Sequence, residues 1–91
     1  MLHSHNFVHN DLKLENIVLG HQDTSRIYLI DFGLTSQYLD HDGQHIKKEQ
    51  LNKFSGNFMF ASLNACRGYS KSRRDDIESF IYMLIYLINH N

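Results

Sequence analysis

Four polar side chains in the first third of the chain have the types and the spacing needed to transfer a phosphoryl group. Asp11, Lys13 and Asn16 fall within one short run, and Asp31 follows Asn16 by fifteen positions. A phosphoryl group in transfer spreads negative charge over its oxygens, so a catalyst must place cations beside them and orient the attacking hydroxyl. Asp11 can accept the hydroxyl proton, and Lys13 can contact the phosphate as a point charge.

Asn16 and Asp31 are hard oxygen donors of the kind that Mg²⁺ prefers, and Asp31 opens an Asp-Phe-Gly tripeptide that ends at Gly33. Each signal alone is weak, and turn residues between strands are the alternative interpretation. Together, their order and distance match the pair of motifs that protein kinases use for phosphoryl transfer. The sequence therefore predicts Mg²⁺ and ATP as cofactors, Asp11 and Lys13 as catalytic residues, and Asn16 and Asp31 as ligands of the metal and nucleotide.

Short apolar runs at 7–8, 17–19 and 26–30 surround these motifs and have the composition of β-strands. The turn-rich residues 20–25 lie between the last two runs, which predicts a hairpin that presents Asn16 and Asp31 at neighbouring strand ends. Residues 1–6 are interpreted as the tail of a helix. From 34 to about 60 the chain is polar and without periodicity, and a loop of this length in a small domain is functional or disordered.

The final element is predicted to be a helix that begins after Ser72. Ser72 with Asp75 three residues later forms a capping-box signature, and Asp75 and Asp76 favour the positive end of the helix dipole. Apolar residues then cover nearly every face, which predicts a buried central helix of a larger domain. Cut off here, the helix would expose that surface, so we expect poor solubility of the isolated chain. The apolar residues are Ile77, Phe80, Ile81, Tyr82, Met83, Leu84, Ile85, Tyr86, Leu87 and Ile88.

Composition excludes several classes of function. The chain has 91 residues and a net charge of −1, which gives no broad attraction to nucleic acid or to an anionic membrane surface. Its longest apolar run, 80–88, is too short to span a bilayer, and no secretory signal opens the chain. The one cysteine, Cys66, cannot form an internal disulfide, so we expect an intracellular protein, cytoplasmic or nuclear. The seven histidines lack a zinc-binding pattern and are interpreted as loop or packing residues.

The chain resembles the casein kinase 1 family of serine/threonine protein kinases over essentially its full length. Most protein kinases end the activation segment with Ala-Pro-Glu, whereas this family has Ser-Ile-Asn followed by Ser-Arg-Arg-Asp-Asp. The related vaccinia-related kinases share part of this pattern and rank second. The resemblance rests on HNDLKLEN at 9–16, YLIDFGL at 28–34, Tyr38, HI at 45–46, SG at 55–56, FASLN at 60–64 and SRRDDIES at 72–79.

This resemblance implies an α+β fold that is part of a kinase-like C-lobe: catalytic loop, short hairpin, long activation segment and central helix. The chain would be a partial kinase domain, 1–91, because eight residues before His9 leave no room for the glycine-rich loop and lysine strand of an N-lobe. Protein substrates would carry serine or threonine, often near acidic or phosphorylated residues. The resemblance also assigns supporting roles to His9, Gly33, Asn57 and Asp76, with Asp76 holding the backbone of the catalytic loop.

Four positions depart from the family pattern. Asn10 replaces the arginine that links catalytic loop to activation segment, and Leu14 replaces a proline of the loop. Asn57 replaces a threonine that bridges the catalytic aspartate and lysine. Met59 replaces an arginine credited with binding phosphorylated substrates, which argues against recognition of primed substrates.

These departures leave a second function class open, a pseudokinase or truncated binding module that docks partners without catalysis. A gene fragment without a role of its own is a third possibility. The retention of Asp11, Lys13, Asn16 and Asp31 favours a catalytic parent protein, with the 91-residue piece alone inactive or nearly so.

Overall fold

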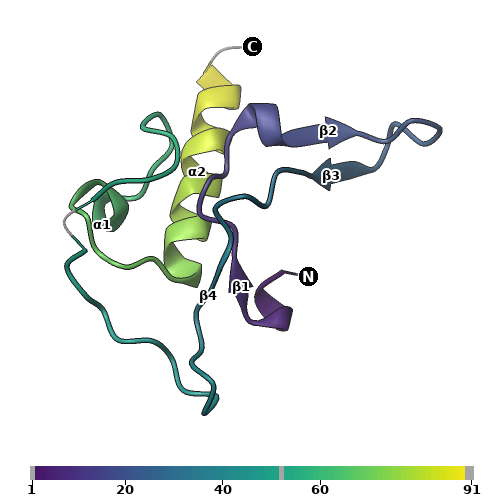
Figure 1. Cartoon of the computed structure of the whole chain (residues 1–91). Coiled ribbons are helices and arrows are strands. Elements are labelled where there is room, and N and C mark those ends of the chain that lie inside the picture. The colour runs from purple at the N-terminus through teal and green to yellow at the C-terminus, as the bar shows by residue number, and fades with distance from the viewer. Residues whose placement is uncertain (1, 52, 90–91) are drawn as a thin grey trace.

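The computed structural model describes residues 2–51 and 53–89. Within these ranges the elements are two 3₁₀ turns, four short strands and two α-helices, so the predicted α+β content is confirmed (Figure 1). In chain order they are η1 (His3–His5), β1 (Phe7–Val8), η2 (Leu14–Asn16), β2 (Ile17–Leu19), β3 (Ile27–Leu29), β4 (Ser36–Gln37), α1 (Leu63–Cys66) and α2 (Arg73–Asn89).

The predicted hairpin is present and projects away from α2 (Figure 1). β2 and β3 are antiparallel, with Ile17 opposite Leu29. The turn requires Gly20, because a Cβ there would lie 2.4 Å from the carbonyl oxygen of Asp23. At the open end, the N–H of Ile30 donates to the carbonyl of Asn16 at 2.8 Å. The hairpin thereby brings the end of one motif beside the start of the other.

A second antiparallel pair, β1 with β4, was not predicted. It joins the strand before His9 to the segment after Gly33, with Val8 opposite Ser36. Residues 34–60 were expected to lack regular structure, and β4 departs from that because the exposed edge of β1 needs hydrogen-bonding partners. The expected N-terminal helix tail is only the 3₁₀ turn η1, which ends at Asn6 in the left-handed conformation, φ 74°.

Between Tyr38 and Ser62 the described residues form neither helix nor paired strand, apart from two isolated bridges. One bridge pairs Leu39 with His45, and the other pairs Gln50 with Tyr69. This long segment leaves the body of the molecule and returns to it ahead of α1 (Figure 1). Its course is consistent with the functional loop expected from its length.

α2 begins as predicted: the N–H of Ser72 donates to Asp75 Oδ2 at 2.7 Å, which is one half of a capping box. The apolar faces of this helix are exposed in this chain, as expected for a central helix cut off from the segments that would bury it. Only Asp75, Asp76, Ser79 and Met83 are buried on it. The catalytic loop and the α1 region cover one side, and most apolar side chains elsewhere on the helix are left exposed by the described residues (Figure 1).

The exposed face of α2 predicts self-association. Ile77, Ile81, Ile85 and Ile88 follow one another at helical spacing and are 47–74% exposed. We expect the isolated chain to form aggregates or oligomers in light scattering, and Ile77→Glu with Ile81→Glu to reduce this while far-ultraviolet circular dichroism is retained. A monodisperse wild-type monomer would contradict the prediction. No helix in the described part of the chain is long and apolar enough to cross a membrane.

Candidate active site

Asp11 lies at the centre of a buried hydrogen-bond network between β1 and η2. It is only 8% exposed. Its backbone N–H donates to His9 Nδ1 at 3.2 Å, and its carbonyl accepts from Asn16 Nδ2 at 2.9 Å. The loop is therefore closed on itself by side chains from both ends of the first motif.

The Asp11 carboxylate has a hydrogen-bond donor at one oxygen and a cation near the other. Asn57 Nδ2 donates to Oδ1 at 3.1 Å, and Lys13 Nζ lies 3.8 Å from Oδ2. Asn57 also donates to the carbonyl of Leu12 at 3.1 Å and accepts from the N–H of Phe60 at 2.8 Å. An amide at this position thus holds the aspartate and both flanking backbones, although it does not bond Lys13 in the contacts observed.

Asp76, at the start of α2, holds the backbone that precedes Asp11. Its carboxylate accepts from the N–H of His9 at 2.7 Å and from the N–H of Asn10 at 3.0 Å. His3 Nε2 contacts the same carboxylate at 2.9 Å. A helix start and a loop 66 positions away thus share one buried carboxylate.

His9 is almost fully buried, and its hydrogen bonds define its tautomer. The backbone N–H of Asp11 can only donate, so Nδ1 accepts. The carbonyl of Ile30 can only accept, so Nε2, at 3.1 Å, carries the proton. Edge contact with the Phe32 ring at 5.6 Å completes its surroundings. A neutral His9 therefore ties the catalytic loop to the strand end ahead of Asp31.

Asn16 and Asp31 have the donor chemistry for Mg²⁺. The nitrogen of the Asn16 amide is used by Asp11, which leaves its oxygen as the acceptor. Asp31 has a left-handed backbone, φ 61°, and its Oδ1 accepts from the N–H of Gly33 at 3.2 Å, while Oδ2 has no contact among those observed. One carboxylate and one amide oxygen fit a metal that keeps waters and phosphate oxygens as its other ligands. In the described residues no three His, Cys, Asp or Glu side chains gather as a metal site.

Asn10, which replaces the family arginine, still links the catalytic loop to the segment after Gly33, through hydrogen bonds between uncharged groups. Its Nδ2 donates to the carbonyl of Leu34 and to Ser36 Oγ, both at 2.8 Å. Its backbone is left-handed, φ 73°, a conformation that asparagine adopts more readily than arginine. Leu14, the other departure in this loop, is the first residue of η2.

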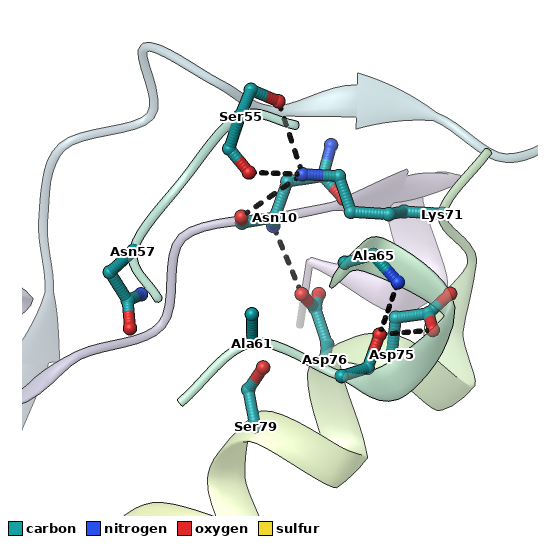
Figure 2. A pocket seen from close by; sticks show the side chains of 10 residues that line it. Asn10, Ser55, Asn57, Ala61, Ala65, Lys71, Asp75, Asp76 and Ser79 are labelled. Carbon is teal, nitrogen blue, oxygen red and sulfur yellow. Dashed lines mark hydrogen bonds between the residues drawn. The ribbon is translucent and has the colours of Figure 1, made fainter. Parts of the chain in front are cut away.

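Lys71 is a site residue that the sequence did not reveal. Its Nζ lies near Ser55 and Asn10, as Figure 2 shows, and these residues are 16 and 61 positions away in the chain. Burial lowers the pKa of its ammonium, while the carboxylates of Asp11, Asp75 and Asp76 act in the opposite direction. No motif marks a single lysine between two serines, so only the folded chain identifies it.

The segment after the long loop is also fixed to α2. Ser62 Oγ donates to Asp75 Oδ1 at 2.6 Å and accepts from the N–H of Ala65 at 3.1 Å, which caps α1. The sequence marked Ser62 only as part of a family motif. Its buried hydroxyl joins both helix starts, since Asp75 also caps α2.

Comparison with known proteins identifies the family of the chain. The model of the protein kinase domain family matches residues 1–91. A probable casein kinase I homolog of Encephalitozoon cuniculi is 44% identical over 86 residues, which cover 94% of this chain and 26% of that protein. Casein kinase 1-like protein HD16 of Oryza sativa subsp. japonica is 46% identical over 92 aligned residues, which cover 96% of this chain and 13% of that protein.

The chain thus spans about a quarter or less of the length of these relatives. The aligned regions include the catalytic loop, the Asp-Phe-Gly turn and the Ser-Arg-Arg-Asp-Asp helix start, because they cover nearly all of the chain. The chain belongs to the protein kinase domain family and, within it, to the casein kinase 1 family.

Proposed function

We propose that the polypeptide that contains this chain is a serine/threonine protein kinase, which transfers the γ-phosphoryl group of Mg·ATP to protein substrates. The observation that carries the proposal is the buried Asp11 carboxylate, oriented by Asn57 and accompanied by Lys13. The chain would supply the catalytic loop, the metal-binding turn, the activation segment and the central helix of the larger lobe. The contacts around Asp11 are formed although Asn10 and Leu14 differ from the family pattern, so these two departures are compatible with phosphoryl transfer.

In this proposal Asp11 accepts the proton of the substrate hydroxyl as the hydroxyl oxygen bonds to the γ-phosphorus and the bond to the ADP oxygen breaks. Lys13, 3.8 Å from that carboxylate, contacts the transferring phosphate. Asn16 and Asp31 would hold Mg²⁺, which neutralises charge on the phosphate oxygens when bound. Asn57 keeps Asp11 oriented through the step.

The finer assignments are part of the same proposal. Residues 34–60 would be the activation segment, and its exposed Lys47, Lys48 and Lys53 support a preference for acidic protein substrates. Met59 is 63% exposed and offers no charge, so selection of phosphorylated substrates is not proposed. We also propose an intracellular location, cytoplasmic or nuclear, on the basis of the single cysteine.

The test compares the isolated chain with the chain joined to the N-terminal lobe of a casein kinase 1 relative. The five glycines, at 20, 33, 43, 56 and 68, are too scattered to form a loop over phosphates, so we expect little or no transfer from the isolated chain. The joined protein should phosphorylate an acidic serine peptide. If it binds Mg·ATP and transfers nothing, the kinase proposal fails.

Asp31→Ala separates the kinase from a binding module. In the joined protein we expect at least about tenfold weaker Mg·ATP binding by calorimetry, because a carboxylate ligand of the metal is lost. Asp42→Ala is the matched control, since Asp42 is exposed and its carboxylate makes no contact among those described. Unchanged Mg·ATP binding in Asp31→Ala would favour a non-catalytic role, for which the exposed apolar face of α2 offers a docking surface.

A further inference from the structure

Lys71 connects two segments that catalysis requires to stay together. The residue lies just before the cap of α2, and its Nζ reaches the carbonyl of Ser55 at 3.0 Å, Ser55 Oγ at 3.2 Å and the carbonyl of Asn10 at 3.5 Å (Figure 2). We propose that Lys71 is a positioning residue for phosphoryl transfer, which holds residues 55–57 on the catalytic loop so that Asn57 reaches Asp11. The inference rests on the proposed kinase function.

The two segments meet backbone to backbone at Gly56. Its φ is 100°, and a Cβ there would lie 2.8 Å from the carbonyl oxygen of Asn10 and 3.7 Å from Asp11 Oδ1. Such an approach leaves no side chain of Gly56 to hold the contact. Lys71 donates to Ser55, the residue before Gly56, and to the carbonyl of Asn10, against which Gly56 packs. A side chain that lies just before α2 therefore holds the two segments together.

Asn57, directly after Gly56, depends on the same contact. Its amide nitrogen is shared between Asp11 Oδ1 and the carbonyl of Leu12, each at 3.1 Å. A shift of about 1 Å in residues 55–57 would break these bonds, and misplacement of this size can cost ~100-fold in rate. Lys71 therefore acts on Asp11 through Asn57, without touching the reacting atoms.

The protonated form of Lys71 is the one that fits. An ammonium has three N–H donors, and the three acceptor atoms on Ser55 and Asn10 use all of them. Deprotonation removes one donor and the positive charge. The carboxylates that face Lys71 are Asp11, Asp75 and Asp76, and they favour the charged form, whereas partial burial disfavours it more and lowers the pKa.

The lowered pKa of Lys71 means that its role in positioning residues 55–57 can be tested apart from its effect on stability. Because the pKa of Lys71 is lower in the folded chain than in the unfolded chain, the unfolded chain binds more protons between the two values. Stability from this group therefore rises with pH across that window, and below it the buried charge subtracts from stability. A neutral replacement should release residues 55–57 without lowering the melting temperature.

The first test uses the 91-residue chain in the Ile77→Glu, Ile81→Glu background, which limits association, and needs no activity. Lys71→Met should raise the rate of chymotrypsin cleavage after Phe54 and Phe58 about tenfold, relative to cleavage after Tyr28 in the hairpin, as local opening of the segment becomes easier. Lys71→Arg should cleave as the wild type does, because it remains charged and can donate to the same acceptors. Lys53→Met is the control, since it removes one exposed charge from the same segment.

Two outcomes of this test overturn the inference. One is unchanged cleavage after Phe54 and Phe58 in Lys71→Met. The other is a lower melting temperature with faster cleavage at all sites, which would make Lys71 a general stabilising residue.

The second test uses the chain joined to an N-terminal lobe. We expect Lys71→Met to lower kcat roughly 10- to 100-fold with the KM for ATP unchanged, and Lys71→Arg to restore it. The alkaline fall in wild-type kcat should move to higher pH in Lys71→Arg, because arginine stays protonated. A wild-type level of kcat in Lys71→Met, or identical alkaline limbs, would contradict the inference. If the joined wild-type protein transfers no phosphate, the proposed function fails, while the cleavage test still decides the role of Lys71.

Discussion

Replacing Asp11 with asparagine is expected to lower kcat for phosphoryl transfer by about 100- to 10,000-fold, because an amide cannot accept the hydroxyl proton. The amide oxygen can still accept from Asn57 Nδ2, as Oδ1 of Asp11 does at 3.1 Å, so the fold and the KM for ATP should change little. Single-turnover transfer to an acidic serine peptide, with the chain joined to an N-terminal lobe, measures the effect.

Glu15→Gln is the matched control for this experiment. It makes the same change of charge four positions away, on an exposed side chain with no observed contact to Asp11. Its kcat should stay close to the wild-type value. If kcat for Asp11→Asn lies within about threefold of kcat for Glu15→Gln, Asp11 is not the proton acceptor. The main argument for a catalytic parent protein then fails.

The second large effect concerns stability. Asp76→Ala should lower the free energy of unfolding by about 3 kcal/mol, since it leaves the buried backbone N–H of His9 and the partly buried N–H of Asn10 without their acceptor. For a domain of this size that is a large share of a total of about 5–15 kcal/mol. Urea unfolding, followed in the Ile77→Glu, Ile81→Glu background to limit association, gives the value.

Asp42→Ala serves as the control for Asp76→Ala, because it removes a carboxylate from the exposed surface. We expect its unfolding midpoint to stay within experimental scatter of the background. The kinase prediction has a further consequence, that the joined Asp76→Ala protein loses activity at temperatures where Asp42→Ala keeps it. Equal midpoints for the two variants would show that the contacts of Asp76 contribute little to holding the loop.

Much of the site could be predicted because its chemistry is local in sequence. Residues 9–16 contain Asp11, Lys13 and Asn16, the last with an oxygen suited to Mg²⁺. The hairpin that brings Asp31 near these residues is predicted by the turn residues at 20–25. The capping interaction of Asp75 with Ser72 is equally local. By contrast, β4 and the 3₁₀ form of η1 depend on the pairing of β1 with a segment far along the chain. No short sequence pattern specifies that pairing.

The packing of α2 was predictable only in part. Its apolar residues correctly predict a helix that needs covering on most sides and that exposes apolar surface in this chain, but the pattern does not say which side is covered. The described chain covers only the side that carries Asp76, Ser79 and Met83. Hydrophobic periodicity thus describes what a helix requires, while the contacts it receives depend on the rest of the fold.

Sequence by itself determined the family and led to the proposed reaction class and its main groups, because those inferences depend on residue types at fixed spacing. Only the tertiary structure decided how the groups are held: Asp76 on the loop backbone, Asn57 on Asp11, and Lys71 across Ser55 and Asn10. These partners lie 16 to 67 positions apart. Such contacts form because buried polar groups need hydrogen-bond partners, and the fold supplies these from distant parts of the chain. The residues that neighbour each group in sequence do not identify its partner.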